Sequence, residues 1–337
     1  MIDRIFKLTE RLTTRMPKVG QTPSQVVFSE NKWRLLRYVP RPEGFAHATP
    51  IVLVPSLINR HYVLDLMPEK SFVEYLVAEG FDVYCIDWGT PEDEDRYVTF
   101  DDIADKYLGR AIRVACRLSR VEQAHVLGYC LGGTLALIHA AVRPEHVRSL
   151  TLLAAPVGFW DSGLLSIWSR TKSFDVAALV RGAGNVPWQL MQSAFHMLRP
   201  TMTISKATTM LDRAWDDEFM DGFLALETWG NDNVSFPGAC YERYIGELYR
   251  NDALVRGEFT LSGERVDLKK LTLPLLAVTF EHDAIVPWQS AAVVMDAIGS
   301  QDKARLHLQG GHVGAVVSKK ARHGLWPALA KVWRERG

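Results

Sequence analysis

One cysteine of the chain, Cys130, lies in a segment whose spacing is typical of a catalytic nucleophile. The segment reads Gly128-Tyr-Cys-Leu-Gly-Gly133, between an apolar run that predicts a strand and a longer one that predicts a helix. A nucleophile at such a strand-to-helix turn is crowded, so the residues two before and two after it must be small, and both are glycine. The helix N-terminus that follows favours the thiolate of Cys130, and the backbone N–H of Leu131 is expected to face a developing oxyanion.

The plainer interpretation of this segment is a glycine-rich turn around a buried structural cysteine. The flanking strand and helix, together with both glycines, favour the catalytic interpretation. The remaining cysteines lack this context, and we interpret them as structural: Cys85, Cys116 and Cys240. The four cysteines form no C-x-x-C pair and no metal-ligand spacing, so the sequence predicts neither a disulfide scaffold nor a metal site.

An acid and a histidine are expected later in the chain, because enzymes with this turn follow the order nucleophile, acid, histidine. Residues 275–280 predict a late strand; Asp283 follows it, with Glu281 as the alternative acid. His312 stands between glycines after a last predicted strand at 305–308. We predict that His312 is the base and that Asp283 orients its imidazole and stabilises the charged form. The alternative histidines are less well placed: His282 beside the acid, His307 inside the strand and His323 near the final helix.

A second oxyanion donor is expected from the loop after the first core strand, residues 54–60, which reads Val-Pro-Ser-Leu-Ile-Asn-Arg. The backbone N–H of Leu57 is the candidate, and that of Ile58 is the alternative. A cysteine nucleophile suits acyl transfer between thioesters, because one sulfur replaces another and the acyl-enzyme remains reactive. These residue types therefore indicate covalent acyl chemistry, with transfer favoured over simple hydrolysis.

Short apolar runs alternate with helical patterns around these residues. They predict strands at 51–54, 83–86, 124–127, 150–153, 275–280 and 305–308, and helices at 71–79, 101–118, 131–141, 288–298 and 325–336. This order predicts an α/β protein of the α/β-hydrolase fold, with a doubly wound, mostly parallel sheet. The aromatic-rich segment 157–270 interrupts the alternation and predicts an inserted cap domain. We expect an N-terminal helix and linker at 1–30 and the two parts of the core at 31–156 and 271–337.

Composition narrows the class of protein further. The 337 residues are 47% hydrophobic and 23% charged, with a formal net charge of zero, which is typical of a globular chain and gives no field to attract nucleic acid. The sequence shows no apolar leader at its start and no uninterrupted apolar stretch of about 18 residues. We therefore expect a cytoplasmic protein without a transmembrane segment, a nucleic-acid partner or a metal.

Five segments, taken together and in order, resemble the polyhydroxyalkanoate synthases. They are residues 54–60 with Tyr62 and 64–66, the sequence Asp87-Trp-Gly89, the nucleophile segment 128–134, the cap segment 229–238 with Tyr244 and Leu254, and residues 283–288 with Gly311 and His312. The likeness runs over roughly residues 25–335. Because only about 30 residues precede it, the chain looks most like the catalytic subunit of the two-subunit, class III synthases. One departure is Ala284, where many members of the family have histidine.

The resemblance implies polymerisation of (R)-3-hydroxyacyl-CoA into a polyhydroxyalkanoate such as polyhydroxybutyrate, with CoA released and no cofactor. It implies that Cys130 carries the growing chain, that His312 activates it and that Asp283 assists the incoming hydroxyl. A second synthase subunit, a homodimer and the polyester granule surface in the cytoplasm are the implied partners and location. Two alternatives stay open: a cysteine hydrolase, either thioesterase or intracellular depolymerase, and a non-catalytic subunit that binds acyl chains.

Overall fold

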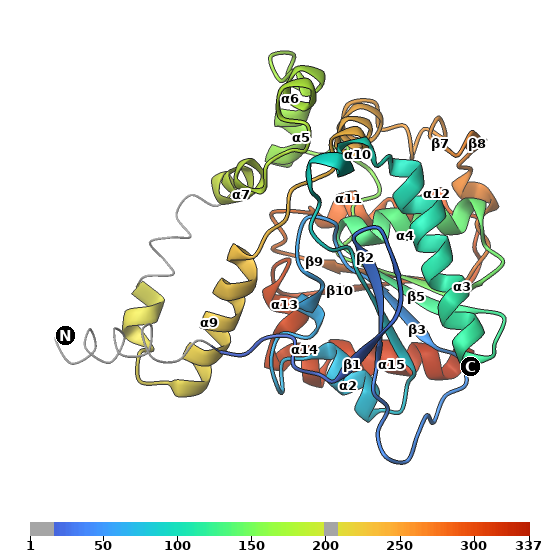
Figure 1. Ribbon diagram of the computed structural model, residues 1–337, viewed down its shortest axis with the longest axis vertical. Coiled ribbons are helices and arrows are strands. Elements are labelled where there is room, and N and C mark those ends of the chain that lie inside the picture. The colour runs from blue at the N-terminus through green and yellow to red at the C-terminus, as the bar shows by residue number, and fades with distance from the viewer. Residues whose placement is uncertain (1–16, 199–207) are drawn as a thin grey trace.

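A central eight-stranded sheet organises the computed structural model, which describes residues 17–198 and 208–337 (Figure 1). The strand order is β1-β2-β4-β3-β5-β6-β9-β10. The strands are β1 Ser24–Glu30, β2 Trp33–Tyr38, β3 Ile51–Val54, β4 Val83–Asp87, β5 Ala124–Tyr129, β6 Val147–Leu153, β9 Leu275–Phe280 and β10 Lys303–Leu308. All neighbours from β4 to β10 pair in parallel, whereas β1 and β2 are antiparallel at one edge. The prediction of a mostly parallel sheet is therefore confirmed.

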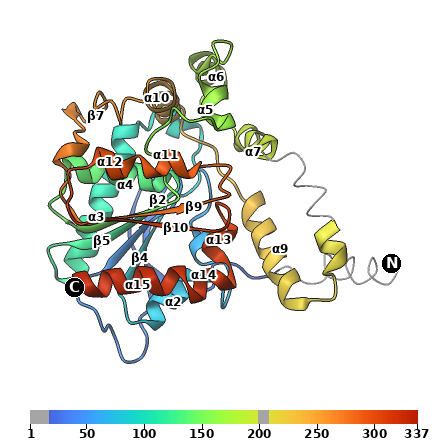
Figure 2. The same ribbon diagram turned by 180° about the vertical axis from the view of Figure 1, so that it is seen from behind.

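Helices cover both faces of this sheet, as Figure 2 shows with the sheet between them. One face carries α3 Leu108–Ser119, α4 Leu131–Val142, α11 Trp288–Ala292 and α12 Val294–Ala297. The other carries α2 Phe72–Ala78, α13 Gly314–Val317, α14 Lys319–His323 and α15 Leu325–Arg336. Central parallel strands enclosed in this way tend to be nearly continuous apolar runs, and β3 is one of them. In β3, Val52 and Val54 belong to the core under α3 and α4, whereas Ile51 and Leu53 belong to the core under α2 and α15.

Local sequence signals account for the element ends that lie near the site. Helix α2 begins after Ser71, whose hydroxyl accepts the backbone N–H of Glu74 at 2.8 Å, and Gly80 with φ of +87° closes the turn that follows. Helix α4 is buried on nearly all sides from its first residue to Ala140. Its all-round apolar sequence is therefore explained by its position between the sheet and neighbouring helices.

Two of the predicted elements are wrong in part, and one predicted helix has an unexpected winding. The linker predicted up to residue 30 contains strand β1, whose exposed edge position gives it only a weak alternation of buried and exposed residues. The helix predicted at 101–118 is present and continuous, but its first part is wound as the π-helix η3 Asp102–Tyr107 before α3 follows. The helix predicted at 288–298 is divided into α11 and α12. The predicted N-terminal helix falls largely on residues 1–16, outside the described part of the chain.

The described residues of the segment between β6 and β9 lie outside the main sheet. Its elements are α5 Leu164–Ser169, α6 Val176–Ala183, α7 Trp188–Met197, α9 Asp217–Asn231, α10 Gly238–Arg243, the π-helix η4 Tyr244–Arg250, the short strands β7 Thr260–Leu261 and β8 Glu264–Arg265, and η5 Leu268–Lys270. Figure 1 shows α5, α6 and α7 projecting at one end of the molecule, with α9 beside the sheet. We refer to this segment, residues 157–270, as the cap.

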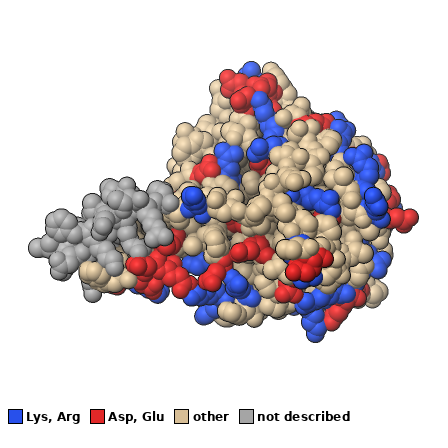
Figure 3. Space-filling view, turned by 60° about the horizontal axis from the view of Figure 1, so that its bottom comes forward, with Lys and Arg blue, Asp and Glu red and all other residues tan. Residues whose placement is uncertain are grey.

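Basic and acidic side chains lie next to one another on the face shown in Figure 3. Ion pairs such as Lys319 with Glu218 and Arg334 with Glu79 join elements across the surface. Among the described helices, none has both the length and the apolar character that a bilayer-spanning helix requires.

Candidate active site

Cys130 occupies a strained turn between β5 and α4. Its φ of 55° and ψ of −129° lie in a region that L-residues rarely adopt, and its backbone N–H donates to the carbonyl of Leu153 at 3.0 Å. A Cβ at Gly128 would collide with the backbone of Gly133, and a Cβ at Gly132 would collide with the carbonyl oxygen of Val54. The two glycines are therefore required by close backbone approach, which is the crowding that the sequence pattern indicates.

His312 and Asp283 form a buried pair at the carboxyl end of the sheet. The Nδ1–H of His312 donates to Oδ2 of Asp283 at 2.7 Å. The other carboxylate oxygen, Oδ1, accepts the backbone N–H groups of Ile285 at 2.9 Å and Val286 at 2.8 Å. Tyr129 stacks on the imidazole with ring centroids 5.2 Å apart. The carboxylate is thus held from one side by the loop and presents its second oxygen to the imidazole.

The alternative acid and one alternative histidine pair with each other instead. Oε2 of Glu281 lies 2.6 Å from Nε2 of His307, whose Nδ1 contacts the hydroxyl of Thr279 at 2.8 Å. The side chains of Glu281 and His307 are 42% and 29% exposed, against 1% and 8% for Asp283 and His312. The structure therefore separates a solvated surface pair from a desolvated one. His323, at the end of α14, is exposed.

The charge state of His312 depends on its two acidic neighbours. Burial by itself lowers the pKa of His312, but the Cys130 sulfur and the Asp283 carboxylate outweigh that effect and raise the pKa to about 10. The hydrogen bond from the imidazole to Asp283 acts in the same direction. Since Cys130 and Asp283 both act on one ring, the three residues predicted from the sequence lie together in the fold.

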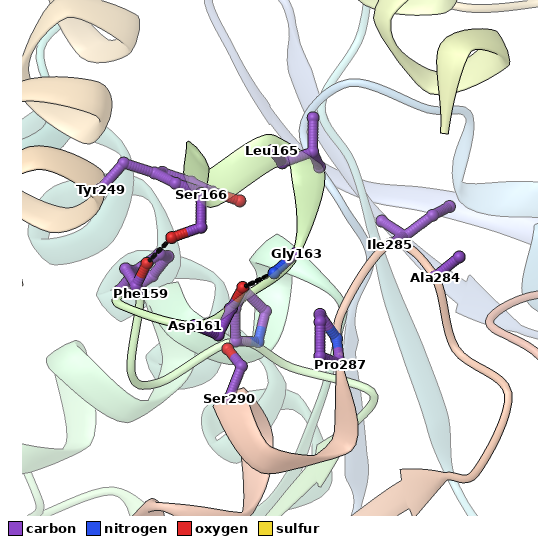
Figure 4. A pocket seen from close by; sticks show the side chains of 11 residues that line it. Phe159, Asp161, Gly163, Leu165, Ser166, Tyr249, Ala284, Ile285, Pro287 and Ser290 are labelled. Carbon is purple, nitrogen blue, oxygen red and sulfur yellow. Dashed lines mark hydrogen bonds between the residues drawn. The ribbon is translucent and has the colours of Figure 1, made fainter. Parts of the chain in front are cut away.

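Cys130 opens onto a cavity of about 460 Å³ between the sheet and the cap. Leu131 and Ile58 line it from the core side, and aromatic and aliphatic cap residues, among them Trp168, Phe195 and Phe236, line it from the other. A smaller pocket adjoins it and shares Pro156, Leu165, Tyr249 and Ile285 with it. Figure 4 shows this smaller pocket, where Asp161 accepts the backbone N–H of Gly163 at 2.6 Å. The main cavity is therefore lined mostly by apolar side chains, as small-molecule sites usually are.

The loop after β3, in which the second oxyanion donor is predicted, is held by the C-terminal end of α9 and the residues after it. Asp232 accepts Nε–H of Arg60 at 2.9 Å and the hydroxyl of Tyr62 at 2.7 Å. The indole N–H of Trp229 donates to the carbonyl of Arg60 at 2.9 Å, and the side chains of Asn59 and Asn233 are hydrogen-bonded. The cap therefore fixes this loop through polar contacts, a link that no single sequence motif indicates.

The side chains of Leu57 and Ile58, which are neighbours in this loop, line different pockets. The side chain of Ile58 lines the cavity with Cys130, whereas Leu57 lines a separate small pocket with Trp33 and Trp88. Leu131, the other predicted donor, is the first residue of α4 and lines the Cys130 cavity. The backbone N–H groups of Leu57 and Leu131 remain predictions as oxyanion donors.

The other cysteines and the metal-ligating residue types do not form a second centre among residues 17–198 and 208–337. Cys85, Cys116 and Cys240 are buried, and burial raises the pKa of each thiol. In that described part of the chain, no group of three or more His, Cys, Asp or Glu side chains is arranged to hold a metal ion.

Comparison with known sequences shows likeness along nearly the whole chain. A profile of the alpha/beta hydrolase fold matches residues 49–316, and a profile described as the N-terminus of poly-beta-hydroxybutyrate polymerase (PhaC) matches residues 13–76. The poly(3-hydroxyalkanoate) polymerase subunit PhaC of Haloferax mediterranei is 34% identical over 339 residues, covering 100% of this chain and 69% of that protein. The subunit of the same name from Allochromatium vinosum is 35% identical over 321 residues, covering 94% of this chain and 90% of that protein.

Among solved structures, a monoacylglycerol lipase from Paleococcus ferrophilus superposes with a TM-score of 0.58 at 16% identity, covering 91% of this chain and 100% of that one. Likeness at such low identity concerns the fold, and it confirms the predicted α/β-hydrolase architecture. The identity to the polymerases is twice as high and extends over nearly all of the chain, which confirms the family resemblance found in the five motifs. This chain therefore belongs to the poly(3-hydroxyalkanoate) polymerase family, on an α/β-hydrolase fold.

Proposed function

We propose that this protein polymerises (R)-3-hydroxyacyl-CoA into polyhydroxyalkanoate through a thioester on Cys130. The observation that carries the proposal is the placement of a strained, partly buried cysteine and a buried Asp283–His312 pair at one apolar cavity. Membership of the polymerase family supports the substrate class, since the relatives are named poly(3-hydroxyalkanoate) polymerases. The cysteine supplies the nucleophile, His312 moves the proton and Asp283 holds the ring.

The first chemical step is acylation of the enzyme. The sulfur of Cys130 attacks the thioester carbonyl, the bond from carbon to the CoA sulfur breaks, and CoA leaves with the proton that His312 held. The oxyanion formed in between is stabilised by the backbone N–H of Leu131 and, in this proposal, of Leu57. This exchange of one thioester for another needs neither a metal nor a redox cofactor.

The second step forms the polyester bond. His312 takes the proton from the 3-hydroxyl of an incoming hydroxyacyl-CoA, and that oxygen attacks the acyl carbonyl held on Cys130. The carbon–sulfur bond breaks, Cys130 recovers its proton through His312, and the chain is one unit longer. Asp283 assists by holding the imidazole where both the sulfur and the hydroxyl oxygen reach it. The lengthened chain, now a CoA thioester, can then acylate Cys130 again.

Incubation of the purified protein with (R)-3-hydroxybutyryl-CoA tests this proposal, with free thiol and product form both followed. CoA release together with insoluble polyester is the expected result, and it should be abolished by Cys130→Ala but retained by the matched control Cys116→Ala. CoA release with soluble hydroxy acid alone would instead make the protein a thioesterase. Release of polymer fragments from added polyester would make it a depolymerase. Near wild-type turnover by Cys130→Ala would refute the assignment of the nucleophile.

We further propose that the cap mediates association with a second synthase subunit or a second copy of the chain, and with the granule surface in the cytoplasm. The relatives are named as polymerase subunits, and the cap exposes large apolar side chains, among them Trp160 at 52%, Ile167 at 47% and Met197 at 56%. Ile167→Lys should weaken co-sedimentation with polyester granules and lower the mass measured by light scattering. The control Val26→Lys, at an equally exposed position on β1, should change neither.

A further inference from the structure

Two tyrosines of the cap, Tyr244 and Tyr249, line the cavity that contains Cys130. They stand five residues apart on η4, which is wound as a π-helix. In a π-helix the backbone hydrogen bonds join residues five apart, so side chains at this spacing lie on nearly the same face, which an α-helix does not allow. The unusual winding of η4 therefore brings both phenols to one side of the helix, toward the cavity.

The two rings contact each other and are held by a third aromatic residue. Their centroids are 5.3 Å apart at an interplanar angle of 80°, and Phe159 packs at 6.0 Å from Tyr244 and 4.8 Å from Tyr249. Each tyrosine also shifts the pKa of the other, so the two phenol groups lie close together. Figure 4 shows Tyr249 beside Phe159 and Ser166 at the border of the smaller pocket. The packing fixes the rings and leaves the paired hydroxyls as the polar end of an aromatic cluster.

Both phenols remain neutral hydrogen-bond donors near the nucleophile. Burial is the main cause that raises the pKa of each, and the electrostatic effect of Cys130 raises both further. Cys130 does not act in this way on Tyr241, a third tyrosine of the same lining, whose pKa burial raises to about 12. The pair thus lies within electrostatic reach of the sulfur.

The rest of the described lining offers few other polar partners. The hydroxyl of Ser169 donates to the carbonyl of Leu165 at 2.6 Å, and most of the remaining side chains are aliphatic or aromatic. An acyl group that carries a hydroxyl on its third carbon must bury that hydroxyl close to the sulfur when it is held on Cys130. A buried hydroxyl without a partner is costly, whereas a pair of phenols can both donate to it and accept from it.

We infer that Tyr244 and Tyr249 bind the 3-hydroxyl of the acyl group at Cys130 and so select 3-hydroxyacyl thioesters over thioesters that lack the hydroxyl. One phenol donates to the hydroxyl oxygen, and the hydroxyl donates to the other phenol. An acyl group without this oxygen leaves the phenols with each other and gains nothing from them. The inference deepens the proposed function and rests on it.

A comparison of two acyl donors tests the inference. The rate of CoA release in a single turnover is measured with (R)-3-hydroxybutyryl-CoA and with butyryl-CoA, for the wild type, Tyr244→Phe, Tyr249→Phe and the control Tyr241→Phe. Phenylalanine keeps the ring and its packing and removes only the hydroxyl. We expect each of the first two variants to lower the preference for the hydroxyacyl donor by roughly tenfold, through slower reaction of that donor alone. Tyr241→Phe should leave the ratio within about twofold, whatever its effect on either rate.

The outcomes separate this inference from the proposed function. If the wild type makes polyester but the Phe variants slow both donors equally, the tyrosines have only a structural role and the inference is overturned while the polymerase proposal stands. The same holds if Tyr241→Phe changes the ratio as much as the other two. If the wild type releases no CoA from the hydroxyacyl donor, the polymerase proposal fails and the inference fails with it. Two independent variants keep the test valid should one of them fold poorly.

Discussion

Replacement of Asp283 by asparagine should remove most of the activity while leaving the fold intact. The structure fixes how the amide must lie. Oδ1 of Asp283 accepts two backbone N–H groups, from Ile285 and Val286, so the amide oxygen has to take that place. The opposite orientation would point the NH₂ group at two donors. The NH₂ group therefore faces Nδ1 of His312, 2.7 Å away in the native pair, and can only donate to it.

This donation forces the wrong tautomer on the imidazole. With Nδ1 as the acceptor, the proton of neutral His312 sits on Nε2, the nitrogen that should take the proton from the nucleophile or the hydroxyl. The carboxylate that stabilises the charged ring is lost as well. For a triad of this arrangement the rate should fall by roughly 10²- to 10⁴-fold, or about 3–5 kcal/mol of barrier at 1.36 kcal/mol per factor of ten.

The assay is the rate of CoA release from (R)-3-hydroxybutyryl-CoA, with the thermal midpoint of unfolding measured on the same samples. Glu281→Gln is the matched control, because Glu281 also holds a histidine but lies in the exposed pair with His307. It should retain activity within about twofold, as expected for a surface ion pair. Asp283→Asn with more than about a third of wild-type activity, or an equal loss in Glu281→Gln, would refute the assigned roles.

Three further substitutions test the turn at Cys130, the charge state of His312 and the loop after β3. Gly132→Ala should destabilise the protein by at least about 3 kcal/mol in chemical unfolding, because its Cβ meets backbone, whereas Gly182→Ala, with open space around its Cβ, should be neutral or stabilising. The pKa of His312, followed by NMR, should fall from about 10 in Cys130→Ala, because the largest effect that raises it is removed; an unchanged pKa would contradict the coupling. Asp232→Asn weakens both contacts to the loop after β3 and should lower kcat by roughly tenfold with little change in KM; a change in KM alone would indicate substrate binding instead.

Much of the fold was predictable from the sequence because the buried elements of its core appear as apolar patterns along the chain. Strands such as β3 and β9 are buried on both faces and therefore stand out as short apolar runs, and both were predicted with the bounds that the structure has. Strand β1 was missed because an edge strand buries one face in part and alternates only weakly. The π-helices η3 and η4 were missed because the winding of a helix depends on packing and does not show in its hydrophobic period.

The candidate triad was indicated by sequence because steric and topological constraints are severe around it. Glycine is the only residue that fits at 128 and 132, and the order of nucleophile, acid and histidine follows from the order of the strands. The choice between Asp283 and Glu281, in contrast, rested on position alone. The structure adds the physical distinction, since one carboxylate is desolvated beside His312 and the other is solvated beside His307.

The sequence by itself therefore determined the parallel part of the sheet, the nucleophile turn and the residue types that could perform acyl transfer, because each depends on neighbours along the chain or on the burial of whole elements. Only the tertiary structure decided what surrounds that chemistry. The cavity, the contacts of Asp232 with the loop after β3, and the two phenols near Cys130 all join segments more than a hundred residues apart. No local pattern encodes such contacts, because they form only when the cap folds back over the sheet.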